Sequence, residues 1–202
     1  EGPVIQAANL RALKAGTTTD KVFELVRKLR ETITIPMVFM TYANVVFSYG
    51  SEKFLSRAAE AGIQGLILPD VPFEEKAEFE PLCAKYGLEL VSMIAPTSHE
   101  RIRSIAAEAK GFVYCVSSLG VTGVRSSITT DIGAMVKLVK ETKAIPAAVG
   151  FGISTPEQAR EMAQKADGVI VGSAIVKLIA ANGRDSVEPV TEYVKAMKDA
   201  IR

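Results

Sequence analysis

The sequence predicts an α/β protein of the (βα)8 TIM-barrel class, on three observations. Short apolar runs alternate with charged, helix-patterned segments along the whole chain. Glycine-rich turns follow the last two runs, and barrels often build phosphate sites from the loops after their last two strands. Polar side chains gather where the runs end, as expected at the barrel face that carries an active site.

Six apolar runs are predicted to form the strands. Each is short, mostly β-branched or aliphatic and bounded by Gly or Pro, which is typical of strands buried on both faces of a parallel sheet. Their separation is roughly the length of one βα unit. The runs cover residues 35–42, 65–71, 88–95, 111–118, 146–152 and 168–176.

The segments between the runs have helical patterns. Pro3 suits a first helical turn and starts a helix at the beginning of the sequence. Ser51, Ser98 and Thr155 are predicted N-caps, and Gly62 and Gly87 are predicted to end helices. The expected helices cover a segment near 20–30 and residues 51–62, 73–87, 98–110, 130–142, 155–166 and 186–202.

Strict alternation leaves an open doubly wound sheet or a closed barrel. A dinucleotide-binding sheet would carry a GxGxxG turn after its first strand, and this sequence has none there. Six strands do not close an eight-stranded barrel. We therefore expect residues 1–202 to form a single barrel domain that is incomplete at its N-terminus, with strands 3–8 present and strands 1–2 missing.

Composition narrows the class of partner and compartment. The net charge is +1, with both signs interspersed, which argues against nucleic acid as a main partner. Cys83, Cys115 and the single His99 lack metal-ligand spacing, so we expect no metal site and a reducing compartment. No apolar run reaches ~18 residues and no signal-peptide pattern appears, so we expect a cytoplasmic protein without membrane contact.

Two glycine-rich turns are the strongest functional signal. In "GFGIST" (150–155) and "GSAIV" (172–176), glycines at a strand end allow backbone N–H groups to approach an anion. Either turn alone is equally typical of a tight βα connection. Their pairing after the last two strands predicts a pocket for a small phosphoester.

Other candidate residues follow the remaining strands. The polar stretch 117–131 could be a lid, with Gly120 and Gly123 as hinges, or a surface loop. Tyr42 and Tyr114 could hydrogen-bond a substrate or serve only in packing. Asp70, between two prolines, could orient a ligand or partner, or only cap the next helix.

No Ser-His-Asp order or catalytic cysteine context is visible in the sequence. Acid–base chemistry would therefore depend on carboxylates, of which Glu1 is one candidate.

Several stretches together resemble the alpha subunit of tryptophan synthase. They are "EGPVIQAANLRAL", "MTYANVVFSYG", "LPDVPFEE", "LGVTG", "GFGIS" and "DGVIVGSAIVK", in the family's order and spacing. The resemblance implies a lyase of L-tryptophan biosynthesis that cleaves indole-3-glycerol phosphate to indole and glyceraldehyde 3-phosphate by a retro-aldol reaction. It also implies a beta subunit as partner in an α2β2 heterotetramer. Pyridoxal phosphate would be in that beta subunit, with no cofactor in this chain.

The resemblance assigns roles to individual residues. Glu1 would be a catalytic carboxylate where the family usually has Asp, and Thr122 would be its lid partner. Asn44 and Asp70 would lie at or near the beta-subunit face. The substrate contacts would be Tyr42, Tyr114, Gly123, Phe151, Gly152, Gly172 and Ser173.

The family's principal acid–base glutamate is expected upstream of these residues, so the 202 residues alone are expected to be inactive. Either the sequence omits an N-terminal portion of a normal enzyme, or the barrel is truncated and exposes an apolar sheet edge.

Two further functions stay open from the residues. One is another phosphosugar barrel, such as indole-glycerol-phosphate synthase or a ribulose-phosphate epimerase. This hypothesis requires catalytic lysines or metal-binding histidines at strand ends, and the six runs show neither. The other is a non-catalytic phosphoester-binding barrel that activates a partner subunit.

Overall fold

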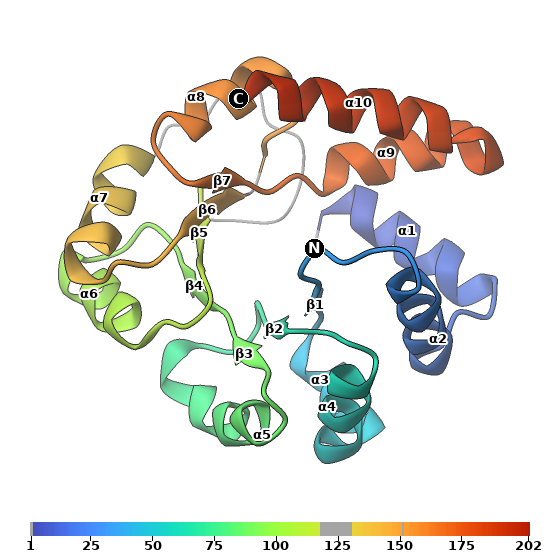
Figure 1. Cartoon of the computed structure of the whole chain (residues 1–202), viewed down its shortest axis with the longest axis horizontal. Coiled ribbons are helices and arrows are strands. Elements are labelled where there is room, and N and C mark those ends of the chain that lie inside the picture. The colour runs from blue at the N-terminus through green and yellow to red at the C-terminus, as the bar shows by residue number, and fades with distance from the viewer. Residues whose placement is uncertain (1, 118–130, 151) are drawn as a thin grey trace.

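The computed structural model describes residues 2–117, 131–150 and 152–202. Its strands follow an inner arc, and its helices lie outside them (Figure 1). The strands are β1 (Val38–Met40), β2 (Gly65–Ile67), β3 (Glu89–Leu90), β4 (Ser92–Ile94), β5 (Val113–Val116), β6 (Ala147–Gly150) and β7 (Gly168–Val169). The helices are α1 (Pro3–Lys14), α2 (Thr19–Arg30), α3 (Ala43–Tyr49), α4 (Ser51–Glu60), η1 (Phe73–Glu78), α5 (Glu80–Lys85), α6 (His99–Glu108), α7 (Ile132–Thr142), α8 (Pro156–Ala163), α9 (Ser173–Asn182), η2 (Gly183–Asp185) and α10 (Val187–Ala200).

Every one of the six predicted runs contains a strand, and all of the strand pairs are parallel. The sheets have the orders β1-β2-β3 and β4-β5-β6-β7. This confirms the predicted α/β class with strands and helices in barrel-like alternation. Within the described ranges, no ladder joins β1 to β7.

The predicted strand 88–95 is divided between the two sheets. Its first part, β3, pairs with β2, and its second part, β4, pairs with β5. Val91 lies between them, and its N–H donates to the carbonyl of Leu66 at 2.9 Å. One continuous segment of chain therefore connects the two sheets.

The last predicted strand was too long. Only Gly168–Val169 pair with β6, and α9 begins at Ser173. A short apolar run does not distinguish a buried strand from the first turn of a buried helix by periodicity alone. Helix α3 was missed for the same reason, because its sequence, "ANVVFSY", is mostly apolar.

Most predicted helix ends are confirmed. The side chains of Ser98 and Thr155 cap α6 and α8, and Gly62 and Gly87 take positive φ just after α4 and α5. Ser51 was wrong as an N-cap, because it is the first residue of α4 and Gly50 precedes it as the cap.

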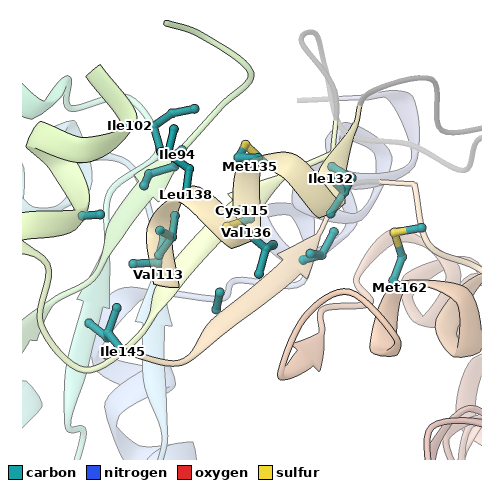
Figure 2. Packing of buried hydrophobic residues seen from close by; sticks show 14 of the residues in the cluster. Ile94, Ile102, Val113, Cys115, Ile132, Met135, Val136, Leu138, Ile145 and Met162 are labelled. Atoms are coloured by element: carbon teal, nitrogen blue, oxygen red, sulfur yellow. The ribbon is translucent and has the colours of Figure 1, made fainter. Parts of the chain in front are cut away.

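Alternate side chains of the central strands face opposite directions. Val113 and Cys115 point outward into a buried cluster with residues of α6 and α7 (Figure 2). Val149 of β6 belongs to the same cluster. Tyr114 and Val116 belong to a separate cluster with Ile67 and Val91. This alternation places Tyr114 on the inner side of the sheet. The outer cluster also contains Ile94, Ile102, Ile132, Met135, Val136, Leu138, Val139, Ile145 and Met162.

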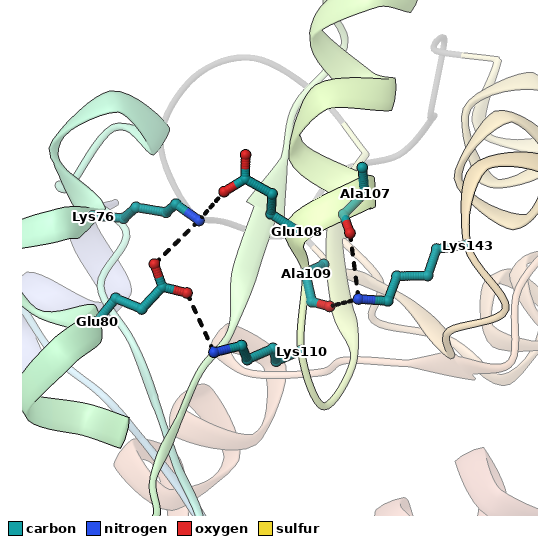
Figure 3. Close-up of polar contacts among 7 residues, drawn as sticks. All are labelled: Lys76, Glu80, Ala107, Glu108, Ala109, Lys110 and Lys143. Carbon is teal, nitrogen blue, oxygen red and sulfur yellow. Dashed lines mark hydrogen bonds and ion pairs between the residues drawn. The ribbon is translucent and has the colours of Figure 1, made fainter. Parts of the chain in front are cut away.

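Charged side chains connect η1 and α5 with the end of α6 (Figure 3). Lys76 pairs with both Glu80 and Glu108, and Lys110 Nζ lies 3.5 Å from Glu80. Lys143 Nζ donates to the carbonyl of Ala109 at 2.6 Å, which satisfies an acceptor at the end of α6. Exposed ion pairs contribute only about 0.2–1 kcal/mol each, so apolar packing dominates the stability of this region.

In the part of the chain that the structure describes, no helix is both long enough and apolar enough to cross a membrane.

Ile94→Ala is expected to lower the free energy of unfolding by about 2–5 kcal/mol, because it leaves a cavity in the outer cluster. Ile94 is 0% exposed, whereas Leu25, on the outer side of α2, is 56% exposed. Leu25→Ala is the matched control and should change stability by less than about 0.5 kcal/mol. Urea unfolding of both variants gives the comparison. Equal losses of unfolding free energy in the two variants would contradict the placement of Ile94 in the buried core.

Candidate active site

A cavity of about 1060 Å³ lies at the carboxyl ends of the strands. Thr41, Pro69, Gly152 and Ile170, which follow β1, β2, β6 and β7, all line it. This is the face on which barrel enzymes carry their active sites. The other lining residues include Ile5, Asn9, Ala12 and Leu13 of α1, Thr17 and Thr18 before α2, and Thr19, Val22 and Phe23 of α2.

The cavity brings together five of the residues predicted from sequence: Tyr42, Tyr114, Gly152, Gly172 and Ser173. They come from four separate segments of the chain. Their contacts with a substrate stay predictions.

Five other predicted residues lie outside the described part of the chain. They are Glu1, Gly120, Thr122, Gly123 and Phe151, and residues 118–130 of the predicted lid also lie outside it.

Aromatic side chains form one wall of the cavity. Phe23 packs against Phe39 and Phe54, with ring centroids 5.7 Å and 5.4 Å apart. All three rings line the cavity, and they come from α2, β1 and α4. Sequence reasoning missed this wall, because it depends on how α2 packs against β1. The apolar periodicity of α2 was the available signal.

Glycine-rich backbone forms another part of the cavity wall. Gly152 is buried and has a φ of 88°, in the left-handed region that favours glycine. Gly172 precedes α9, whose first residue is Ser173. The first N–H groups of a helix have no intrahelical partner, and the helix dipole favours an anion there. The structure thus places both glycine-rich turns at this wall, and their role in binding a phosphate stays a prediction.

Tyr114 and Gly150 face each other on neighbouring strands. In the β5–β6 register Val116 is the partner of Gly150, so Tyr114 lies on the same inward face. A Cβ on Gly150 would lie 2.5 Å from Cζ and 2.7 Å from Cε1 of Tyr114, and closer still to its Oη. Burial raises the pKa of Tyr114 to about 12, so the phenol keeps its proton at neutral pH.

Asp70 holds the start of α3. Both of its carboxylate oxygens accept the N–H of Ala43, at 3.1 Å each. Of the two roles that the sequence left open for Asp70, capping of the following helix was wrong, since η1 begins after Pro72 and has no side-chain cap. Asp70 does not line the cavity; it is exposed, as are Asn44 and Phe47 of α3.

The two cysteines are buried thiols. Burial raises the pKa of Cys83 to about 11 and that of Cys115 to about 12. For Cys83, the nearby carboxylates of Glu80 and Glu89 act in the same direction. A thiol that keeps its proton is a poor nucleophile, so neither residue is placed to do covalent chemistry.

Gly150→Ala is expected to displace the Tyr114 ring into the cavity, because a buried overlap of this size cannot be absorbed without movement. The displaced ring should weaken the binding of an indole-sized ligand by at least about tenfold. Titration calorimetry with indole measures the effect. The double variant Gly150→Ala/Tyr114→Val also lacks the overlapping ring atoms. It should recover part of the stability that Gly150→Ala alone loses. If Gly150→Ala binds and unfolds like the wild type, the inferred contact is wrong.

Native protein at pH 8 should react with iodoacetamide at least about 100-fold more slowly than protein in guanidinium, because both thiols are buried and protonated when folded. The raised pKa values of the two thiols also make the free energy of unfolding depend on pH. The ordinary pKa of a thiol is near 8.5, so the unfolded chain loses these protons at a lower pH than the folded chain does. The free energy of unfolding should therefore fall as pH rises above about 8.5. Equal alkylation rates in the two states would contradict the burial of Cys83 and Cys115.

Comparison with known proteins identifies the family. The family model described as tryptophan synthase alpha chain matches residues 1–202. The tryptophan synthase alpha chain of Lacticaseibacillus casei is 45% identical to this chain over 201 residues. The corresponding chain of Lactiplantibacillus plantarum is 48% identical over 202 residues. Each comparison covers 100% of this chain and 76% of the relative. A solved structure of the tryptophan synthase α2β2 complex from Pyrococcus furiosus is similar at a TM-score of 0.88 and 32% identity, covering 98% of this chain and 81% of the other. The chain belongs to the tryptophan synthase alpha chain family.

Proposed function

We propose that the cavity binds indole-3-glycerol phosphate for its retro-aldol cleavage to indole and glyceraldehyde 3-phosphate. The observation that carries this proposal is the pairing, in one cavity, of an aromatic wall with glycine-rich backbone. Phe39 lies in β1 and Phe54 in α4, whereas Ser173 is the first residue of α9, after β7. Strands β1 and β7 are the two ends of the strand arc (Figure 1). A substrate with a planar apolar ring and a phosphate requires both.

The phosphate would bind at the end of the cavity formed after β6 and β7. Backbone N–H groups near Gly152 and Gly172, with the hydroxyl of Ser173, supply hydrogen-bond donors there. A phosphate at the start of α9 also gains from the helix dipole. Gly123, outside the described residues, is proposed from the family resemblance as a further contact.

The indole ring would lie against the apolar surfaces near Tyr42 and Tyr114. Aromatic side chains contribute both buried area and favourable ring packing to such a site. The phenol of Tyr114 keeps its proton at neutral pH, because burial raises its pKa to about 12. It therefore acts as a neutral hydrogen-bonding group beside the substrate. Phe151 is proposed as a further contact from the family resemblance.

The cleavage step needs a group that stabilises the positive charge developing on the indole ring. From the family resemblance, the Glu1 carboxylate would accept the indole N–H and stabilise the indoleninium by its opposite charge. Thr122 would pair with this carboxylate.

We also propose that a beta subunit is the partner of this chain, as in the α2β2 complex from Pyrococcus furiosus. The exposed surface formed by Asn44, Phe47 and Asp70 lies beside the cavity-lining residue Tyr42, which suits an interface that communicates with the site. Pyridoxal phosphate would be held by that partner, and a cytoplasmic location would follow from this role.

The full-length product of this gene should release indole from indole-3-glycerol phosphate. Glu1→Ala in that product should abolish turnover, because the developing charge loses its counterion, yet leave the binding of glycerol 3-phosphate measurable. Glu24→Ala, which removes an exposed carboxylate from α2, is the control and should leave turnover unchanged. Indole release is followed by its absorbance.

Near-normal turnover by Glu1→Ala would contradict the catalytic assignment. A wild-type protein that activates the beta subunit without releasing indole would instead support the non-catalytic alternative.

A further inference from the structure

We infer that Tyr193 and Gln158 are positioning residues that hold the turn after β6 in its phosphate-binding shape. The inference rests on the proposed phosphate role of that turn. Neither residue lines the cavity, and both act through the backbone of Ser154, two residues beyond Gly152.

Tyr193 fixes the carbonyl side of Ser154. Its hydroxyl donates to the Ser154 carbonyl at 2.8 Å, across 39 residues of sequence. Tyr193 is half-buried and packs against the outer core cluster, and Met197, one turn later on α10, is buried in that cluster. The phenol ring is therefore held in place by packing, so its hydroxyl is a fixed donor.

Gln158 fixes the amide side of the same residue. Its Oε1 accepts the Ser154 N–H at 2.8 Å, the Ser154 hydroxyl at 3.1 Å and the Thr155 N–H at 3.2 Å. Gln158 is held in turn by the capping box that it forms with Thr155 at the start of α8. Both backbone polar groups of Ser154 are thus bound by side chains from α8 and α10.

This arrangement restrains the neighbouring glycine turn. Gly152 has no side chain and a left-handed φ of 88°, so its own conformational preferences do not hold it there. Fixing Ser154 on both sides limits the rotations available to the preceding peptide groups. The N–H groups near Gly152 are then oriented before a ligand arrives, which lowers the entropy cost of binding.

Helix α10 also packs against α9, the helix whose first residue is part of the proposed phosphate site. It packs against both α8 and α9, and α9 begins at the cavity-lining Ser173 (Figure 1). One helix thereby sets the position of the turn after β6 relative to the start of α9. The hydrogen bond from the Tyr193 hydroxyl to the Ser154 carbonyl joins α10 to the turn after β6.

The test compares the wild type with Tyr193→Phe and Thr191→Val, using two probes that occupy different parts of the site. Tyr193→Phe keeps the ring and removes only the hydroxyl. Thr191→Val removes a hydroxyl of the same helix that donates within α10, to the Val187 carbonyl. Calorimetric titrations with inorganic phosphate and with indole are run on each protein, and thermal unfolding is recorded in parallel.

Tyr193→Phe should weaken phosphate binding about three- to tenfold, the range expected for one lost hydrogen bond, and leave indole binding unchanged. Thr191→Val should change neither constant. Gln158→Met, which removes the acceptor from Ser154, should show the same selective loss. In the full-length gene product, Tyr193→Phe should raise KM for indole-3-glycerol phosphate with kcat within about twofold of wild type.

Unchanged phosphate binding by Tyr193→Phe would overturn the inference while leaving the proposed function intact. Equal weakening of both probes, with a lowered Tm, would overturn it in favour of a general structural role. A wild-type protein that binds indole but not phosphate would instead contradict the proposed function, on which the inference rests.

Discussion

The parallel register of β5 with β6 is the constraint on which the rest of the site depends. It places Val116 opposite Gly150 and turns Tyr114 inward, where only a glycine leaves room for its ring. The alternate residues, including Cys115, fill the outer core. A slip of one residue would exchange these faces and place core side chains in the cavity. Packing and site geometry are therefore set by the same backbone hydrogen bonds.

Because all of the strand pairs are parallel, their carboxyl ends meet at one face, and the turns that follow them share one cavity. The turns after β6 and β7 are short and contain Gly152 and Gly172, so their shape depends on what holds them from outside. Asp70 holds the start of α3, and Tyr193 and Gln158 hold Ser154. In each case a residue that does not line the cavity fixes backbone next to one that does.

The sequence allowed the strands and the glycine-rich turns to be predicted because their signals are local. Buried apolar runs bounded by Gly or Pro identify strands, and Gly152 and Gly172 mark the turns directly. What was missed depends on tertiary contacts. The division of a strand at Val91, and the aromatic wall around Phe23, both arise from packing between segments far apart in sequence. The partner of Asp70 was missed too, because Ala43 precedes it by 27 residues.

The decisive measurement is a crystal structure of the chain with an analogue of indole-3-glycerol phosphate whose carbon–carbon bond to the indole ring cannot be cleaved. The phosphate should lie within hydrogen-bond distance of the backbone near Gly152 and Ser173. The indole ring should lie in the same cavity, beside Tyr114. A phosphate bound elsewhere, or an indole ring outside the cavity, would show that the cavity is not the substrate site.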